Sequence, residues 1–293
     1  MKKHPQWHTG GVRRASRLWL ALLTASISGA AFCHDFWLSP GEFQPPAGQP
    51  VELTLTVGND FAGATLPRIN DWFIDFDVRV PDGKRLPIAG TVGADPAGRF
   101  TPERPGLYVA NYQTTRTFVE IPPVRFNKYL RMEGLEHVLP WRARLGEATR
   151  NAKEYYSRSV KTLINVAPDQ APANHRRQGY RHDFGMPIEL IPLRNPYTLQ
   201  PGDRLPVQVR YLDQPLANVL VIAFRELSPN VKQTVRTDAR GEADITLHRP
   251  GQWLVKATHI IRAPEAVLDE YEWESFWAAL TFELNATPAT LRH

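Results

Sequence analysis

The amino-acid sequence predicts a mainly β protein with two antiparallel β-sandwich domains, of the immunoglobulin-like or transthyretin-like kind, and a helical insert between them. Three observations predict this class. Apolar and polar residues alternate in many short segments, which is typical of strands that bury one face. Turns rich in proline and glycine separate these segments at short intervals. The alternation stops between residues 126 and 165, where a period of three to four indicates helix.

The first sandwich is expected at residues 34–124. Alternation is clearest at residues 51–57 and 74–80, where aliphatic and aromatic residues take turns with charged and hydroxyl residues. The segment 81–84, with the sequence Pro-Asp-Gly-Lys, has the composition of a tight turn. These residues therefore predict antiparallel strands joined by short connections.

The helical insert and a connector are expected at residues 125–185. Apolar residues recur at a spacing of three and four in two stretches, namely Phe126, Tyr129 and Leu130, then Tyr156, Val160, Leu163 and Ile164. Such spacing favours amphipathic helices, and Pro140 and Gly146 divide the insert into shorter pieces. Residues 167–185, with several histidines and arginines, are interpreted as an exposed connector.

The second sandwich is expected at residues 186–293. Strand-like alternation returns at residues 205–209, 219–223, 243–247 and 253–257. Residues 104–110 also resemble residues 249–257. This internal similarity indicates that the two halves are copies of one type of sandwich.

Residues 1–33 have the composition of a secretory signal peptide, with basic residues before an apolar stretch and small residues at Ala31 and Cys33. The apolar stretch is shorter than the roughly 20 residues that a membrane-spanning helix needs. We therefore expect a periplasmic protein with no transmembrane segment after cleavage. The alternative, a lipidated Cys33, is disfavoured because the bulky Phe32 precedes it.

The positive charge of the chain belongs to this leader. The full sequence has 35 basic and 30 acidic residues, and five of the basic residues lie before residue 18. Cleavage leaves equal numbers of both kinds, so we predict no nucleic-acid partner. The only cysteine is Cys33, and the mature protein is expected to lack disulfides and thiolate ligands.

Cleavage after Cys33 makes His34 the first residue of the mature chain. Its free α-amine and ring Nδ1 then chelate one metal ion, which an internal histidine cannot do because its nitrogen is part of an amide. The neighbouring Asp35 is expected to coordinate directly or to orient a ligand imidazole, while its purely structural role is a cap or surface charge.

Three further residues are candidate ligands of the same ion. His259 shares strand parity with Trp253 and lies at the end of a predicted strand, where the alternative is a core histidine. His182 belongs to a histidine- and arginine-rich loop that explains it without a metal. Glu274 lies in an aromatic segment interpreted as a core anchor, and its carboxylate completes a mixed nitrogen and oxygen site.

The sequence lacks the motifs of common enzymes. It contains no glycine-rich phosphate loop, no His-Glu-x-x-His helix and no Gly-x-Ser-x-Gly elbow. We therefore predict a binding protein, with no catalytic residues and no organic cofactor.

Eight segments together resemble a family of exported proteins that carry a domain of unknown function, DUF4198. They lie at residues 34–38, 128–135, 154–163, 188–192, 195–197, 201–203, 257–259 and 273–277. The resemblance implies a periplasmic component of nickel or cobalt uptake that passes the metal to a membrane transporter. It also implies that His34 and His259 are the matching histidines, although members usually have alanine where this chain has Cys33.

Three functions follow from these observations. The first is a periplasmic protein that binds a divalent transition metal, nickel, cobalt, copper or zinc, and serves its uptake. The second is a copper oxidase that uses the N-terminal histidine chelate. The third is a β-sandwich interaction module that binds no metal.

Overall fold

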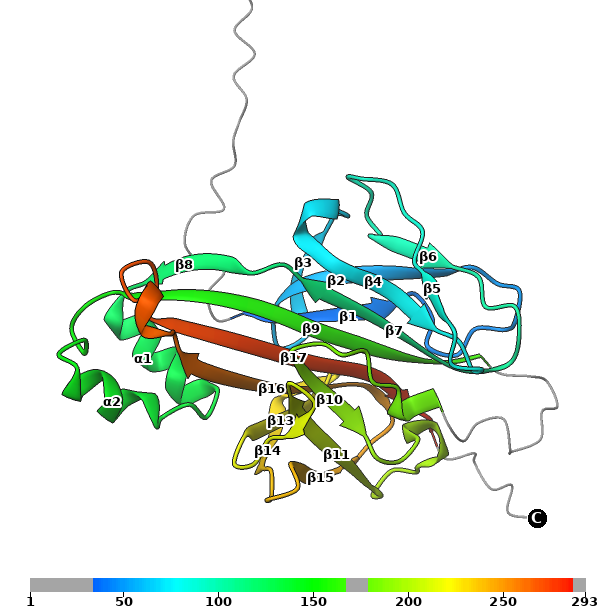
Figure 1. Cartoon of the computed structure of the whole chain (residues 1–293). Helices are drawn as coiled ribbons and strands as arrows, with labels where there is room; N and C mark the ends of the chain where they lie inside the picture. The colour runs from blue at the N-terminus through cyan, green and yellow to red at the C-terminus, as the bar shows by residue number, and fades with distance from the viewer. Residues whose placement is uncertain (1–33, 167–178, 287–293) are drawn as a thin grey trace, which may run out of the picture.

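The computed structural model describes residues 34–166 and 179–286, and most of them lie in β-strands (Figure 1). The predicted mainly β class is confirmed, because antiparallel pairing dominates every sheet. The predicted signal peptide, residues 1–33, lies outside the described residues. Within the two described ranges, no helix is long and apolar enough to cross a membrane.

A nine-stranded sheet runs through the centre of the molecule and contains strands from both halves of the sequence. Its members are β4 (Phe73–Arg79), β5 (Arg85–Pro87), β7 (Gly106–Thr114), β8 (Thr117–Ile121), β9 (Ala152–Val166), β13 (Leu220–Arg225), β14 (Ser228–Arg236), β16 (Gly251–Arg262) and β17 (Trp273–Leu284). Their order is β14-β13-β16-β17-β9-β7-β4-β5, with β8 also paired to β9. The parallel pair β9 and β17 joins the strands of the two halves into one sheet.

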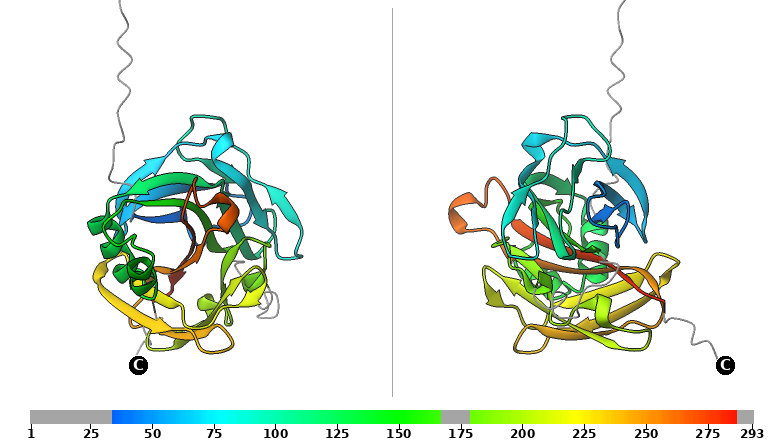
Figure 2. Two further views of the ribbon diagram at one scale, coloured as in Figure 1. Left: turned by 60° about the vertical axis from the view of Figure 1, so that its left-hand side comes forward. Right: turned by 90° about the vertical axis from the view of Figure 1, so that its right-hand side faces the viewer.

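Two four-stranded sheets cover opposite faces of this central sheet (Figure 2). One contains β1 (Asp35–Pro40), β2 (Val51–Asn59), β3 (Ala62–Leu66) and β6 (Gly98–Phe100), and the other β10 (Ile188–Pro192), β11 (Arg204–Tyr211), β12 (Gln214–Pro215) and β15 (Glu242–Thr246). Consecutive residues of β9 face the two different sheets, since Leu163 packs under the sheet that contains β10 and Ile164 packs under the sheet that contains β1. The two sandwiches thus share their central layer.

The strands expected from alternation occur where the pattern is clearest. Residues 51–57 and 74–80 correspond to β2 and β4, and the turn at residues 81–84 joins β4 to β5. Gly83 in that turn has φ 85°, a left-handed conformation that glycine adopts without strain. The local turn chemistry therefore identified this hairpin correctly.

The helical interpretation of the second half of the insert was wrong. Residues 152–166 form the long strand β9, which pairs with β7, β8 and β17. From Ser159 to Val166 every residue is buried, because sheets or helices cover both faces of this part of the strand. A strand buried on both faces loses its alternation, so its apolar residues happened to match a helical spacing.

The first half of the insert does contain helices. Helix α1 (Pro123–Met132) begins with a proline at its first position, where no intrahelical N–H is needed, and α2 (Val138–Arg144) follows it. Phe126, Tyr129 and Leu130 of α1 pack against Trp273 and Trp277 of β17. The helices thus lie at one end of the central sheet (Figure 1). Trp273 and Trp277 have the same parity on β17 as Ala279, which packs under the sheet that contains β1, so the helices cover the same face as that sheet.

Candidate functional site

Asp35 is the first residue of β1, and its carboxylate is fixed inside the protein. Its side chain is only 4% exposed, and Oδ1 lies 2.6 Å from Nζ of Lys256 on β16. The same ammonium group lies 2.7 Å from Oε1 of Glu133, at the end of α1. Thr258 Oγ1 donates a hydrogen bond of 3.0 Å to the other oxygen of Glu133. We call Asp35, Lys256, Glu133 and Thr258 the anchor cluster.

The anchor cluster joins three elements that are far apart in sequence. Burial disfavours the charged form of Lys256, but the charges and hydrogen bonds of Glu133 and Asp35 outweigh burial and raise the pKa of this lysine. Lys256 is therefore charged at every physiological pH. Two carboxylates share one ammonium group, so the cluster with both acids ionised carries one net negative charge.

His34 is half-buried and directly precedes the anchored Asp35. Asp35 pairs with Gly58 of β2, so the backbone next to the histidine belongs to a regular antiparallel ladder. The position of His34 is consequently set from two sides, by the ladder and by the buried carboxylate of the following residue.

His259 lies on the opposite face of the central sheet from the anchor cluster. Side chains alternate along β16, so Lys256 and His259 point to opposite faces. Ala257, which has the parity of His259, packs in the core beneath the sheet of β10 and β11. The predicted joint site of His34 and His259 would therefore have to bridge a β-sheet.

The imidazole of His259 has a mostly aromatic environment. Its ring centroid lies 4.7 Å from that of Tyr211, and it pairs across the ladder with Phe276. Burial and, to a smaller extent, the nearby His137 lower the pKa of His259 to about 4. The ring is thus neutral at pH 7, which is the form that either packs in a core or binds a metal.

Glu274 shares the face of His259 but already has a cationic partner. Ile261, two residues beyond His259, pairs with Glu274 across the ladder. The Oε1 atom of Glu274 lies 3.1 Å from the guanidinium of Arg116. Together with burial, this carboxylate raises the pKa of Tyr211, and burial is the larger cause.

His182 lies in the segment that leads to β10, apart from both groups. Its Nε2 is buried and has no hydrogen-bond partner within the described residues. Burial lowers the pKa of His182, and the charges of Arg79 and Lys161 add to this effect. His175, the other histidine of the predicted connector, lies outside the described residues.

The structure therefore distributes the predicted ligands over three places. His259 and Glu274 share one face, Asp35 lies on the other face beside His34, and His182 lies in a loop. Across residues 34–166 and 179–286, no group of three or more His, Cys, Asp or Glu side chains is arranged to hold a metal ion.

Sequence reasoning missed Lys256 and Glu133. The signal for the lysine was present, since Lys256 interrupts an apolar run in the middle of a predicted strand. A long charged side chain at a buried position needs a partner of opposite charge. The partner itself was not predictable, because Glu133 comes from a helix that ends 123 residues earlier in the chain.

A second buried carboxyl group, that of Glu154 on β9, lies on the same face of the central sheet as the anchor cluster. It accepts hydrogen bonds from Ser275, at very short range, and from Tyr129 at 3.4 Å. Trp277 Nε1 donates to Ser275 Oγ over 3.0 Å. Burial raises the pKa of Glu154 to about 7, and the two hydrogen bonds oppose this shift. Unlike Asp35, this carboxyl forms no ion pair with a lysine in the part of the chain that the structure describes.

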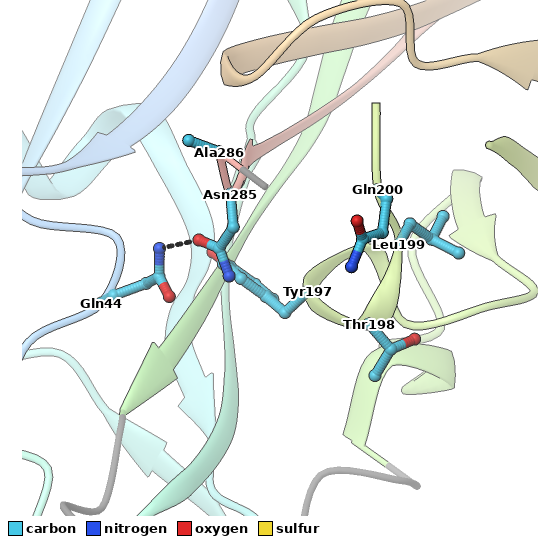
Figure 3. A pocket seen from close by; sticks show the side chains of 7 residues that line it. All are labelled: Gln44, Tyr197, Thr198, Leu199, Gln200, Asn285 and Ala286. Carbon is cyan, nitrogen blue, oxygen red and sulfur yellow. Dashed lines mark hydrogen bonds between the residues drawn. The ribbon is translucent and has the colours of Figure 1, made fainter. Parts of the chain in front are cut away.

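A polar pocket of about 400 Å³ lies at the far end of β17, away from all of these residues (Figure 3). Gln44 donates hydrogen bonds there to Asn285, at very short range, and to Glu283 over 3.1 Å. Tyr197 uses its hydroxyl to donate to the backbone oxygen of Leu163 over 2.6 Å. These polar groups bind one another, so the pocket is best explained as a structural junction.

Comparison with known proteins places the chain in a family. The model of the family described as a domain of unknown function, DUF4198, matches residues 31–261, and the chain belongs to this family. The predicted resemblance is therefore confirmed. No curated protein matches the sequence.

Solved structures give only distant similarities. The D0-D1 domain of intimin is 13% identical over 84% of this chain and 96% of its own, with a TM-score of 0.19. A tetra-tandem repeat of a large adhesion protein is 14% identical over 87% of this chain and 50% of its own, with a TM-score of 0.22. A DUF4785 family protein from Legionella pneumophila is 11% identical, covering 75% and 50%, with a TM-score of 0.24. None of these similarities bears on function.

Proposed function

We propose that this protein is a periplasmic carrier of a divalent transition metal that serves metal uptake. Removal of residues 1–33 frees the α-amine of His34, and the amine and ring Nδ1 of that residue chelate the ion. Nitrogen ligands of this kind suit nickel, cobalt, copper and zinc, and the affinity order favours copper in vitro whatever metal is carried in the cell.

The observation that carries this proposal is the anchor cluster next to His34. A flexible chain terminus loses conformational freedom when it chelates an ion, and this loss weakens binding. Asp35 is held by Lys256 at 2.6 Å, so the residue that follows the chelating histidine is already fixed before the metal arrives. The net negative charge of the cluster also favours a cation nearby.

The available donors fit an incomplete site. Because the described residues hold no cluster of three metal-ligating side chains, the chelate of His34 leaves coordination positions free for water or for a partner. An open position suits a protein that hands its ion to a membrane transporter. In this proposal Asp35 is a positioning residue, since its carboxylate is occupied by Lys256.

The amine makes binding sensitive to pH. An α-amine has a reference pKa of about 7.7 to 8 and must lose its proton to bind a metal. Affinity is therefore expected to fall as the pH is lowered through this range.

The test is calorimetric titration of the exported protein with nickel and copper, after its N-terminus has been established by intact mass. His34→Ala and a variant with one alanine inserted before His34 are both expected to bind at least about tenfold more weakly, since the first removes the ring nitrogen and the second turns the chelating amine into an amide. His259→Gln is the matched control on the opposite face and is expected to bind as the parent does. Unchanged affinity in the insertion variant would exclude the amine as a ligand.

A further inference from the structure

A cavity of about 300 Å³ opens at one end of the N-terminal sandwich, between the central sheet and the sheet of β2 and β3. Most of its wall is apolar and comes from six strands and the short helix at residues 70–72. Representative lining side chains are Leu55, Val57, Leu66, Trp72 and Tyr112. The volume is at the lower end of the range of about 300 to 1,000 Å³ that is usual for small-molecule sites.

One cation, Arg158 of β9, lies in this apolar wall. Its guanidinium carbon is 5.1 Å from the ring centroid of Phe36 and 4.6 Å from that of Tyr156. Two aromatic contacts of this kind hold the planar group and partly compensate for its lost hydration. The orientation of the guanidinium is therefore fixed by packing.

Arg158 forms no ion pair within the described residues, although its charge slightly lowers the pKa of the more distant Glu154. Its Nε is buried and makes no hydrogen bond, and the guanidinium forms no ion pair there. The nearest carboxyl on the same strand, Glu154, takes its hydrogen bonds from Ser275 and Tyr129 instead. The donors of Arg158 are thus available at the wall of the cavity.

Other arginines have partners that Arg158 lacks. Arg262 binds both carboxylate oxygens of Glu147, at 2.6 and 2.9 Å. Arg85 pairs with Asp75 and Asp77 at 2.7 and 2.5 Å. Arg142, which is almost fully buried, binds backbone oxygens instead, those of Glu147 and Arg150 at 2.6 and 2.8 Å. Arg158 differs from all three, because its guanidinium lines a cavity and has neither a carboxylate nor a backbone oxygen as a partner among the described residues. A ligand carboxylate accepts two parallel N–H bonds from such a planar group.

We propose that this cavity binds a small organic carboxylate with an aromatic or branched apolar body. The carboxylate forms the ion pair with Arg158, and the apolar body packs against Leu55, Val57 and Leu66. Trp72, which is 47% exposed at the lining, covers the ligand at the opening. This site is separate from the proposed metal chelate and stands whether or not the chain carries a metal.

The test uses 3-phenylpropanoate as the probe, with the cleaved protein in the presence of a chelator so that no metal mediates binding. Calorimetry and the indole N–H resonance of Trp72 report occupancy. The neutral analogue 3-phenylpropan-1-ol is expected to bind about tenfold or more weakly, and the cationic 3-phenylpropylamine more weakly still, because both lose the charge-assisted hydrogen bonds.

Two variants complete the test. Arg158→Met is expected to bind the acid and the alcohol equally, and Leu66→Trp is expected to bind neither, because its larger side chain fills the cavity. Equal binding of acid, alcohol and amine to the parent protein would overturn the proposal even if Arg158→Met failed to fold. So would the absence of any heat or resonance shift with the acid at millimolar concentration.

Discussion

Two buried lysines, on opposite faces of the central sheet, use the same interaction in different ways. Lys161 of β9 lies 2.7 Å from Glu189 of β10, and both side chains are at most 3% exposed. Lys256 of β16 faces the other side and serves two carboxylates, Asp35 and Glu133. The first pair joins two strands within one sandwich, whereas the second group joins β16, the end of α1 and the first residue of β1.

The two lysines also differ in how completely their partners are satisfied. Glu189 accepts two further hydrogen bonds, from the backbone N–H groups of Phe184 and Met186 at 2.9 and 3.1 Å. Charge is balanced at this pair, and the two backbone hydrogen bonds fix the segment that leads to β10. The anchor cluster keeps a negative charge instead. The balanced pair therefore serves packing, while the unbalanced cluster is the one on which the proposed function rests.

The largest expected effect comes from removing each lysine. Lys256→Met leaves two buried carboxylates without a counter-ion, and we expect it to lower the free energy of unfolding by about 5 kcal/mol. Lys161→Met leaves one carboxylate that still accepts two backbone hydrogen bonds, and about 3 kcal/mol is expected. Urea denaturation at pH 7 measures both values, and a larger loss in Lys161→Met would contradict the comparison.

A buried carboxyl without a lysine gives the next effect. The pKa of Glu154 is raised in the folded state from 4.5 to about 7, so the folded protein favours the neutral carboxyl. The contribution of this group to the free energy of unfolding is therefore fully present below pH 4.5 and is lost as the pH rises through 7. Glu154→Gln keeps an uncharged side chain at every pH. We expect the variant to be more stable than the parent at pH 9, by on the order of 3 kcal/mol. Thermal unfolding between pH 5 and 9 tests this, and parallel curves for the two proteins would show that Glu154 does not titrate in this range.

The smallest effect is expected at the surface. Lys232 lies 2.6 Å from Asp60, with both side chains more than a third exposed. Water screens such a pair, so Lys232→Met is expected to change the free energy of unfolding by less than about 1 kcal/mol. The same urea titration serves as the control for the two buried lysines. A loss as large as that of Lys161→Met would mean that burial is not the cause of the difference.

The sequence predicted the strands that have one buried and one solvated face, such as β2 and β4, because their side-chain period of two is visible in the residue types. It failed for β9, whose inner residues are buried on both faces and so carry no period. The sequence also did not predict that both halves share one sheet, since the parallel pairing of Trp273 with Glu154 joins segments more than 100 residues apart.

The candidate site shows the same division. His34, Asp35, His259 and Glu274 were selected by residue type and by their position in local patterns. Their grouping depended on strand parity and long-range pairing, and these place Asp35 on one face and His259 with Glu274 on the other. Lys256 was noticeable only as a charge in an apolar run, and its two partners come from distant elements.

The mainly β class, the local turns and the membership of the DUF4198 family could all be predicted from the amino-acid sequence, because each depends on the order of residue types along short segments. The pairing of charges could not be predicted in this way and required the three-dimensional contacts. Burial and pairing arise between segments far apart in the chain, as with Asp35, Glu133 and Lys256, and in the unpaired Arg158 of the N-terminal sandwich. These contacts, rather than the residue types alone, distinguish a structural charge from one that is free to bind a ligand.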